Sequence, residues 1–437
     1  MILSNKTHYI IVSLFILFSL YSNASFSSDN TSNNIRIGAG DSKTGYETED
    51  YTTDSKAIEA RQGKRANLIR VIKTPPLGLP PIPVPANNPI TEQKIALGRK
   101  LFFDRRLSLN NTFSCAICHI PEQGFTNSEL EKAVGVEGRL HRRNSPTIYN
   151  TAYLKRLFHD GRESSLETLV WSPLLAHNEM AMPSIGQVIK RIKNLPDYQG
   201  LFEIAFDGHQ ANPVTIGQAL ASYNRVLVSG NSPFDRWYYG KEKRAISTQA
   251  IRGFDLFKGK AQCINCHTIG ETSALFTDNK LHNVGLDFIR SMTVASPEQE
   301  TMLIDPGLYM KISQAFRKTV ALTPLPDIGQ YEITQNPDDR WKYRTPSLRN
   351  VALTGPYMHD STIHSLKEVI AFYNQGGICH NENSFPNVTQ SLLIKPLDLT
   401  EQESDDLVAF LNTLNGDNVD ELISDAFATP VGDTISH

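Results

Sequence analysis

The sequence has no strong excess of either charge, few cysteines and no long apolar run beyond its first 24 residues. Its 43 basic residues face 46 acidic ones, which excludes the basic footprint of a nucleic-acid-binding protein. No repeat of 20–50 residues is visible. With 40% apolar and 20% charged residues, the composition is that of an ordinary globular protein. A length of 437 residues is enough for about two or three domains with buried cores.

The one long apolar run lies at the N-terminus. Residues 1–24 begin with a lysine at Lys6, continue through an apolar stretch and end with small residues at Ser22 and Ala24. This pattern is typical of a secretory signal peptide cleaved near Ala24. An uncleaved anchor is the alternative, but the apolar core is shorter than the roughly 20 residues that span a bilayer. We therefore expect a periplasmic protein with no membrane span in the mature chain.

Residues 25–90 are expected to form a disordered, Pro-rich leader. The stretch to about Lys64 is polar, and residues 75–89 read PPLGLPPIPVPANNP, which is typical of an extended polyproline segment or a strap over a surface. Folded structure is expected from about Thr91.

Helical periodicity dominates over strand alternation after Thr91. Apolar residues share one helical face at 95–102, at 185–192 and at 216–227. A capping box at 400–403 opens a further helix with Leu407, Phe410 and Leu411 facing inward. Long connections rich in Gly, Pro, Asn and Asp separate these segments. The sequence predicts a mainly α protein with long ordered loops.

Four of the five cysteines stand in two C-x-x-C-H motifs, the pattern of c-type haem attachment. Two thiols one helical turn apart reach the two vinyl groups of one porphyrin, and the next histidine then lies under the iron. A redox dithiol does not require that histidine, and a zinc site would need more ligands nearby. We expect two covalently bound haem c groups, held by Cys115, Cys118 and His119 and by Cys263, Cys266 and His267.

The two motifs divide the chain near residues 239–246. We expect two c-type-cytochrome-like haem domains, an N-terminal one over 91–245 and a C-terminal one over 246–437. The fifth cysteine, Cys379, lacks the partner needed for a third haem. A shielded free thiol is the expected state, with intermolecular pairing left open.

Two haems alone do not define an enzyme. A non-catalytic dihaem electron carrier and a haem-based redox or gas sensor are both compatible with the motifs. The distinction depends on whether one iron has an open face with an acid–base group above it.

Several stretches carry a more specific signal. They include LGRKLFFDRRLS, RRNSPTIYN, FHDGRESSLE, SGNSPFDRW, RGFDLFKGKAQCINCH, LHNVGL, RTPSLRNVALTGPYMHD and AFYNQGG. Together they resemble the dihaem cytochrome c peroxidase family with its MauG-like branch, from about Pro76 to Gly416. The resemblance implies that hydrogen peroxide reacts at the first haem and that the second haem handles electrons. The reductant would be a small cytochrome c, a cupredoxin or a side chain of a protein substrate.

The resemblance also implies a catalytic carboxylate. Glu179 stands at the distal glutamate position, where it would take the first proton of hydrogen peroxide and return it to the leaving oxygen. The alternative is a solvated surface glutamate. The position of the histidine that caps the peroxidatic iron in several relatives falls on Val136, with His141 close enough to substitute. An uncapped iron would resemble the MauG-like branch.

Tyr373 in AFYNQGG stands where many peroxidases of the family have a methionine and MauG-like members a tyrosine. A phenolate ligand would stabilise oxidised iron at the second haem, whereas the alternative is a packed core aromatic. Two residues depart from the family pattern. His159 replaces a tryptophan that often relays electrons between the haems, and Leu169 replaces a common glutamine.

The resemblance further implies a calcium ion between the domains, bound at Asn144, Thr354 and Pro356 through oxygen atoms. Three other histidines lie in loop motifs near the second haem. We expect His282, His359 and His364 to be structural or propionate-bonding rather than iron ligands.

Overall fold

The computed structural model describes residues 35–37, 51–53, 63–130, 132–292, 299–305, 308–313, 327–377, 387 and 389–428. The expected signal peptide at 1–24 and Cys379 lie outside the described residues. Helices dominate the described part, as the sequence predicts. Its strands form two-stranded antiparallel sheets: β1 (Ile35–Ile37) with β2 (Tyr51–Thr53), β3 (Leu281–His282) with β6 (Tyr343–Arg344), and β4 (Gln299–Asp305) with β5 (Leu308–Ser313).

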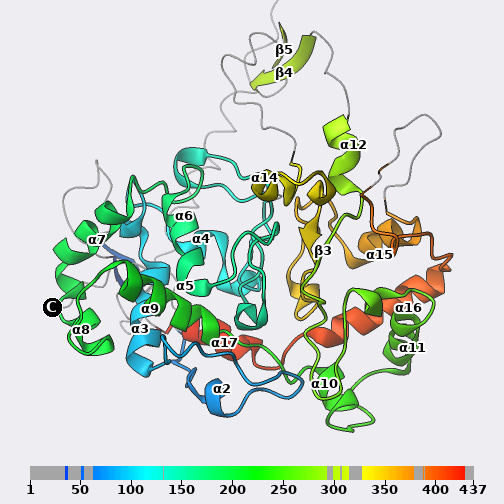
Figure 1. Cartoon of the computed structure of the whole chain (residues 1–437), viewed down its shortest axis with the longest axis horizontal. Helices are drawn as coiled ribbons and strands as arrows, with labels where there is room; N and C mark the ends of the chain where they lie inside the picture. The colour runs from blue at the N-terminus through cyan, green and yellow to red at the C-terminus, as the bar shows by residue number, and fades with distance from the viewer. Residues whose placement is uncertain are drawn as a thin grey trace, which may run out of the picture.

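Buried apolar side chains form two large clusters along the chain. Figure 1 shows the helices on which they are built. The first is built mainly on α3 (Glu92–Phe103) and α9 (Pro213–Val226). The second is built mainly on α11 (Thr248–Lys258) and α16 (Glu401–Leu411). One C-x-x-C-H motif packs against each cluster. The other helices are α2 (Arg70–Lys73), α4 (Cys115–Cys118), α5 (Leu166–Leu169), α6 (Trp171–Leu175), α7 (Ile185–Asn194), α8 (Leu201–Ala205), α10 (Pro233–Tyr238), α12 (Leu286–Met292), α14 (Tyr331–Thr334), α15 (Leu366–Asn374) and α17 (Val419–Ala426).

The predicted helical faces are buried. Leu101 and Phe102 of α3 are almost inaccessible, and Val188 and Ile192 of α7 are equally covered. The capping box at the start of α16 is confirmed, because the Thr400 side chain accepts the backbone N–H of Glu403 while that carboxylate accepts the Thr400 N–H.

Each cluster contains one very close helix crossing at a glycine. A Cβ placed on Gly98 of α3 would lie 1.9 Å from the carbonyl oxygen of Ala219 in α9. A Cβ on Gly253 of α11 would lie 1.9 Å from the carbonyl oxygen of Asp406 in α16. Both crossings therefore require a residue without a side chain, and the two clusters share this packing device.

Packing starts earlier than the Thr91 expected from the sequence. Leu68, Val71, Leu79 and Ile82 are buried in the first cluster. The proline-rich strap is held by apolar contacts that a composition argument does not reveal, because each apolar residue has a partner far away in sequence. At the other end, Leu422 of α17 also packs into the first cluster, so the chain returns there after α16.

Candidate active site

The first C-x-x-C-H motif forms α4 and the residue after it. Nδ1 of His119 lies 3.2 Å from the carbonyl oxygen of Phe125. A proton on Nδ1 would be held by that carbonyl, which leaves Nε2 as the ligand atom. Burial lowers the pKa of His119 to about 4, so the imidazole is neutral at physiological pH, as a metal ligand must be.

The second motif repeats this arrangement. Cys263–Asn265 form a short 3-10 turn, and Nδ1 of His267 lies 2.8 Å from the carbonyl oxygen of Phe276. Burial also lowers the pKa of His267. The two histidines are therefore oriented by equivalent backbone carbonyls.

The chemistry of the thiols argues against a redox dithiol. Burial raises the pKa of Cys115 and of Cys118 to about 12, and that of Cys263 likewise to about 12. A reactive dithiol needs a lowered thiol pKa, which is the opposite shift. Paired buried thiols beside a neutral histidine fit covalent haem attachment at both motifs.

Two loop segments, 144–160 and 344–360, are in contact where the two halves join. They are equivalent in the two halves, so that each residue of the first corresponds to the residue 200 positions later in the second. The N–H of Asn144 donates to the carbonyl of His359 at 2.7 Å. The N–H of Arg344 donates to the carbonyl of His159, also at 2.7 Å. These two reciprocal backbone hydrogen bonds join the halves in a pseudo-two-fold arrangement.

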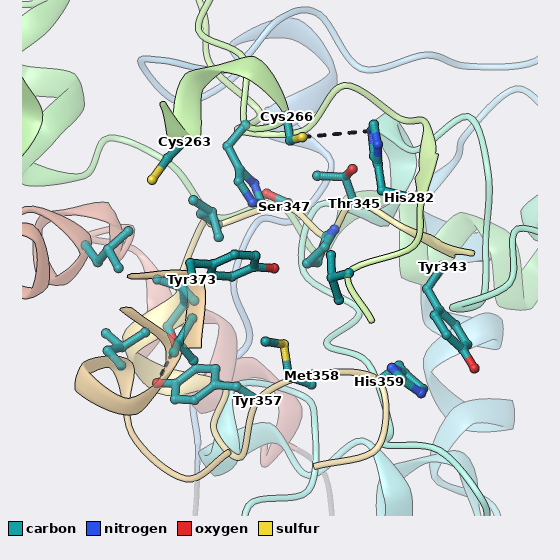
Figure 2. Close-up of a pocket in the computed structure, with 18 of the residues that line it drawn as sticks. Cys263, Cys266, His282, Tyr343, Thr345, Ser347, Tyr357, Met358, His359 and Tyr373 are labelled. Carbon is teal, nitrogen blue, oxygen red and sulfur yellow. Dashed lines mark hydrogen bonds between the residues drawn. The ribbon is translucent and has the colours of Figure 1, made fainter. Parts of the chain in front are cut away.

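A large cavity opens beside the second motif (Figure 2). Cys263, Cys266 and His267 line one side, and Tyr373 of α15 points into it from another. The remaining walls are largely apolar, with Leu366, Ile370, Leu397, Leu399, Leu407 and Leu411 among them. A largely apolar cavity with the two thiols and the histidine of one C-x-x-C-H motif in its wall fits a haem.

The Tyr373 hydroxyl has no hydrogen-bond partner among the described residues. Burial raises its pKa, and the nearby thiols of Cys266 and Cys263 add to the shift. Met358 lies in the same cavity, below the Tyr373 hydroxyl in Figure 2. The sequence analysis did not single out this methionine, because its position after a tyrosine in a loop gives no ligand signal.

Glu179 lies in the turn between α6 and α7, close to the first motif. Its charge raises the pKa of both Cys115 and Cys118, which places the carboxylate within electrostatic reach of the thiols. The backbone carbonyl of Glu179 accepts the N–H of Val136 at 3.0 Å, so the turn is fixed. Burial raises the pKa of Glu179 to about 7, and the Arg162 charge opposes that shift. The side chain is partly buried, so Glu179 is not a freely solvated surface carboxylate.

Comparison with known proteins identifies the family of this chain. The di-haem cytochrome c peroxidase family matches residues 92–243. A cytochrome-c peroxidase IdrP1 of Denitromonas iodatirespirans is 40% identical over 357 residues, covering 78% of this chain and 87% of that protein. The chain belongs to the dihaem cytochrome c peroxidase family.

Other members extend the comparison to the MauG-like branch. The methylamine utilization protein MauG of Methylorubrum extorquens is 36% identical and is covered over 82% of its length. The crystal structure of a MauG-like protein associated with microbial copper homeostasis aligns with a TM-score of 0.63 at 32% identity, covering 79% of this chain and 96% of that one. This dihaem peroxidase is a peroxidase-type oxidoreductase with two haem cofactors implied by its family. Among the described residues, no helix is both long and apolar enough to cross a membrane.

Val136 and His141 are the two residues expected near the capping position of the first site in this peroxidase. Val136 is fully buried. His141 lies close enough to His119 to lower its pKa, and its own pKa is lowered by burial. The buried Nε2 atom of His141 has no hydrogen-bond partner within the described part of the chain. His141 therefore offers a ring nitrogen near the first motif, whereas Val136 has no ligand atom in its side chain.

The three loop histidines have separate environments. His282 pairs with Asp278 at 2.8 Å, and His359 hydrogen bonds to a carboxylate oxygen of Asp287. His364 donates its backbone N–H to Glu368 at the start of α15.

The residues expected at the calcium site partly converge. The Asn144 side-chain amide donates to the carbonyl oxygen of Pro356 at 2.7 Å, and Thr354 lines the same cavity. Arg344, which sequence reasoning missed, is also buried beside this cavity. Burial lowers its pKa to about 10, so the guanidinium keeps its charge and favours an anion nearby.

Proposed function

We propose that this protein is an exported, periplasmic dihaem peroxidase that reduces hydrogen peroxide at its first haem. Electrons enter through the second haem from a small cytochrome c or a cupredoxin, or from a side chain of a protein substrate. The observation that carries the proposal is the partly buried carboxyl group of Glu179 beside the first motif, where burial raises its pKa to about 7.

In this proposal one haem c is bound over residues 91–245 and the other over 246–437. Cys115 and Cys118 hold the first porphyrin and His119 its iron. Cys263, Cys266 and His267 hold the second, and Arg344 pairs with a propionate. Bound haem would supply an iron that takes up peroxide and stores oxidising equivalents.

Glu179 moves the proton. Near neutral pH its carboxyl group is partly ionised, so a carboxylate oxygen accepts the proton of the peroxide oxygen that approaches the first site. The same carboxyl group then gives that proton to the departing oxygen, which leaves as water. Partial burial of the Glu179 carboxyl group raises its pKa and favours the protonated form between the two transfers.

The second site lacks such a carboxyl group among its described residues. Asp278 hydrogen bonds to His282. Burial raises the pKa of Asp278, but its hydrogen bonds, with the one to His282 foremost, together outweigh this and lower it, so the carboxylate stays ionised and bonded to His282. Tyr373 would provide a hard oxygen ligand that stabilises oxidised iron. The second haem is therefore suited to electron storage, as in the MauG-like branch.

A calcium ion at the junction is a further part of the proposal. It would take the Pro356 carbonyl oxygen and, after rotation of the side chain, the amide oxygen of Asn144, with Thr354 contributing from the same loop. The amide N–H that now satisfies the Pro356 carbonyl would be displaced.

Electron paramagnetic resonance of the oxidised holoprotein, followed by stopped-flow mixing with peroxide, tests the proposal. We expect a high-spin ferric signal from the first haem and a rapid optical change. Glu179→Gln should slow that change by about 10²–10⁴-fold, the usual contribution of a positioned acid–base group.

The matched control is Glu137→Gln, an exposed carboxylate on the loop that packs against Glu179. It should react like the parent. Two low-spin irons with no optical response to peroxide, or a Glu179→Gln variant as fast as the parent, would refute the enzymatic role.

A further inference from the structure

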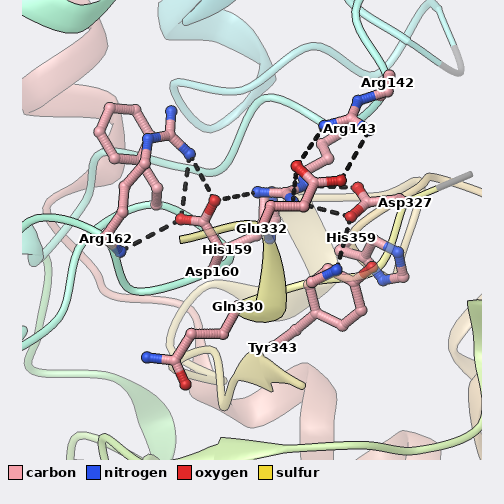
Figure 3. A network of polar contacts seen from close by, with 12 residues as sticks. Arg142, Arg143, His159, Asp160, Arg162, Asp327, Gln330, Glu332, Tyr343 and His359 are labelled. Atoms are coloured by element: carbon pink, nitrogen blue, oxygen red, sulfur yellow. Dashed lines mark hydrogen bonds and ion pairs between the residues drawn. The ribbon is translucent and has the colours of Figure 1, made fainter. Parts of the chain in front are cut away.

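Three polar residues form a buried cluster at the junction that the proposed peroxide chemistry does not use. Tyr343, Asp287 and His359 are 8%, 4% and 7% exposed, respectively. The rings of Tyr343 and His359 lie face to face, with centroids 3.7 Å apart and an interplanar angle of 14° (Figure 3). Such close stacking brings the two π-systems into direct contact.

Asp287 joins both rings through one oxygen atom. The Tyr343 hydroxyl donates to Oδ2 of Asp287 at 2.6 Å, and Nε2 of His359 hydrogen bonds to the same oxygen. A distance of 2.6 Å is typical of a hydroxyl bonded to an ionised carboxylate. The phenol therefore has a proton acceptor in place before any electron leaves it.

The cluster is assembled from three separate segments. Tyr343 is in β6, Asp287 is in the first turn of α12, and His359 is in the loop before α15. Apolar packing alone does not explain this cluster. Burying three polar side chains costs free energy unless each has a hydrogen-bond partner.

The position of the cluster connects the two halves. Tyr343 and His359 line the cavity of the second motif. On the other side, the ring of His159 lies 6.5 Å from that of His359, and its Nε2 hydrogen bonds to the Asn144 carbonyl at 2.9 Å. Pro146, two residues after Asn144, lies near His119 and also lines the cavity of the second motif. The aromatic stack thus lies at the junction between the two motifs.

The charges around Tyr343 favour loss of its proton together with an electron. The Arg143 guanidinium lies 5.5 Å from the centre of the Tyr343 ring, where its Asp327 and Asp160 partners hold it (Figure 3). A nearby cation disfavours a positively charged ring radical. Burial and the Asp327 and Asp287 carboxylates raise the pKa of Tyr343, so the phenol stays protonated until it is oxidised.

We propose that Tyr343 is a redox-active tyrosine that relays an oxidising equivalent across the junction. The inference rests on the proposed function, because peroxide supplies the oxidant. One electron leaves Tyr343 for an oxidised haem, the phenolic O–H bond breaks, and the proton moves to the Asp287 carboxylate. The neutral tyrosyl radical regains an electron from the reducing partner and its proton from Asp287, so the site returns to its starting state.

Freeze-quench electron paramagnetic resonance of the holoprotein after peroxide addition tests this relay. We expect an organic radical signal that narrows when the protein contains ring-deuterated tyrosine. Tyr343→Phe keeps the stacked ring but should lose the signal. Asp287→Asn keeps the phenol but removes the proton acceptor, and should lose it as well.

Tyr357→Phe is the matched control, because Tyr357 lines the same cavity but donates its hydroxyl to the carbonyl of Val351 rather than to a carboxylate. It should keep the signal. Haem content and thermal unfolding of each variant establish that the fold is intact.

The optical spectrum separates two kinds of failure. If peroxide changes the haem spectrum of the parent but Tyr343→Phe keeps the parental radical, or the parent forms none, the tyrosine relay is wrong and the peroxidase proposal stands. If Asp287→Asn keeps the radical, the assigned proton acceptor is wrong. If peroxide leaves the haem spectrum unchanged, both proposals fail.

Discussion

The two halves of the molecule share a scaffold but differ above their histidines. Each half places a C-x-x-C-H histidine against a backbone carbonyl, and each crosses two helices at a glycine, Gly98 in one and Gly253 in the other. Beyond these features, Glu179 stands near the first motif and Tyr373 near the second. The shared parts bind a cofactor, so the differing residues decide what each site does.

One local difference accounts for these two positions. In the second half, α15 runs without interruption from Leu366 to Asn374, and its last turn carries Tyr373. In the first half, the equivalent stretch is broken into α5 and α6, and Pro173 stands 200 positions before Tyr373. The chain then turns, which brings Glu179 towards the first motif. The interrupted helix is followed by the turn that carries Glu179, whereas the continuous helix carries Tyr373.

The largest expected effect concerns Glu179, which only the first half has near its motif. It is the pH dependence of the peroxide reaction. Glu179 must be ionised to accept a proton, and burial raises its pKa to about 7. The rate should therefore be level above pH 7 and fall about tenfold for each pH unit below it. Stopped-flow rates between pH 5 and 9 would measure the profile. A profile that survives Glu179→Gln would assign the titration to another group and remove Glu179 from the comparison.

The next effect tests what the halves share. Gly98→Ala and Gly253→Ala each place a methyl group 1.9 Å from a backbone oxygen, so each should destabilise the holoprotein by about 2 kcal/mol, net of the better helix propensity of alanine. Urea unfolding measures this. Gly186→Ala in α7 is the control, because the added Cβ would meet only a side-chain oxygen at 3.7 Å, and it should not destabilise. A large loss of unfolding free energy for one glycine variant and none for the other would show that the two crossings are not equivalent.

The sequence predicted the elements that depend on local patterns. The helical faces at 95–102 and 185–192, the capping box at Thr400 and the two haem motifs all follow from spacing within a few residues. The duplication of 144–160 at 344–360 was not recognised, although five of the 17 aligned pairs are identical, because the identities are scattered and the reciprocal backbone hydrogen bonds show it only in the structure.

The residues that sequence reasoning missed depend on contacts between distant segments. Asp287 contacts Tyr343, 56 positions later, and His359, 72 positions later. No sequence motif predicts contacts between residues so far apart. Likewise, the buried apolar residues before Thr91 are stabilised by partners in the first core cluster. Composition describes a segment alone, whereas burial depends on what packs against it.

The smallest expected effect concerns the second site alone. Tyr373→Phe removes a hydroxyl that points into the cavity without a hydrogen-bond partner among the described residues, so the fold should be retained (Figure 2). If the phenol binds the second iron, the low-spin spectrum of that haem changes while the signal of the first haem does not. Tyr357→Phe in the same cavity serves as the control. Identical spectra for Tyr373→Phe and the parent would remove Tyr373 as a ligand and make Met358, whose sulfur lies in the same cavity, the next residue to substitute, because a soft sulfur would tune the second site differently from a hard oxygen.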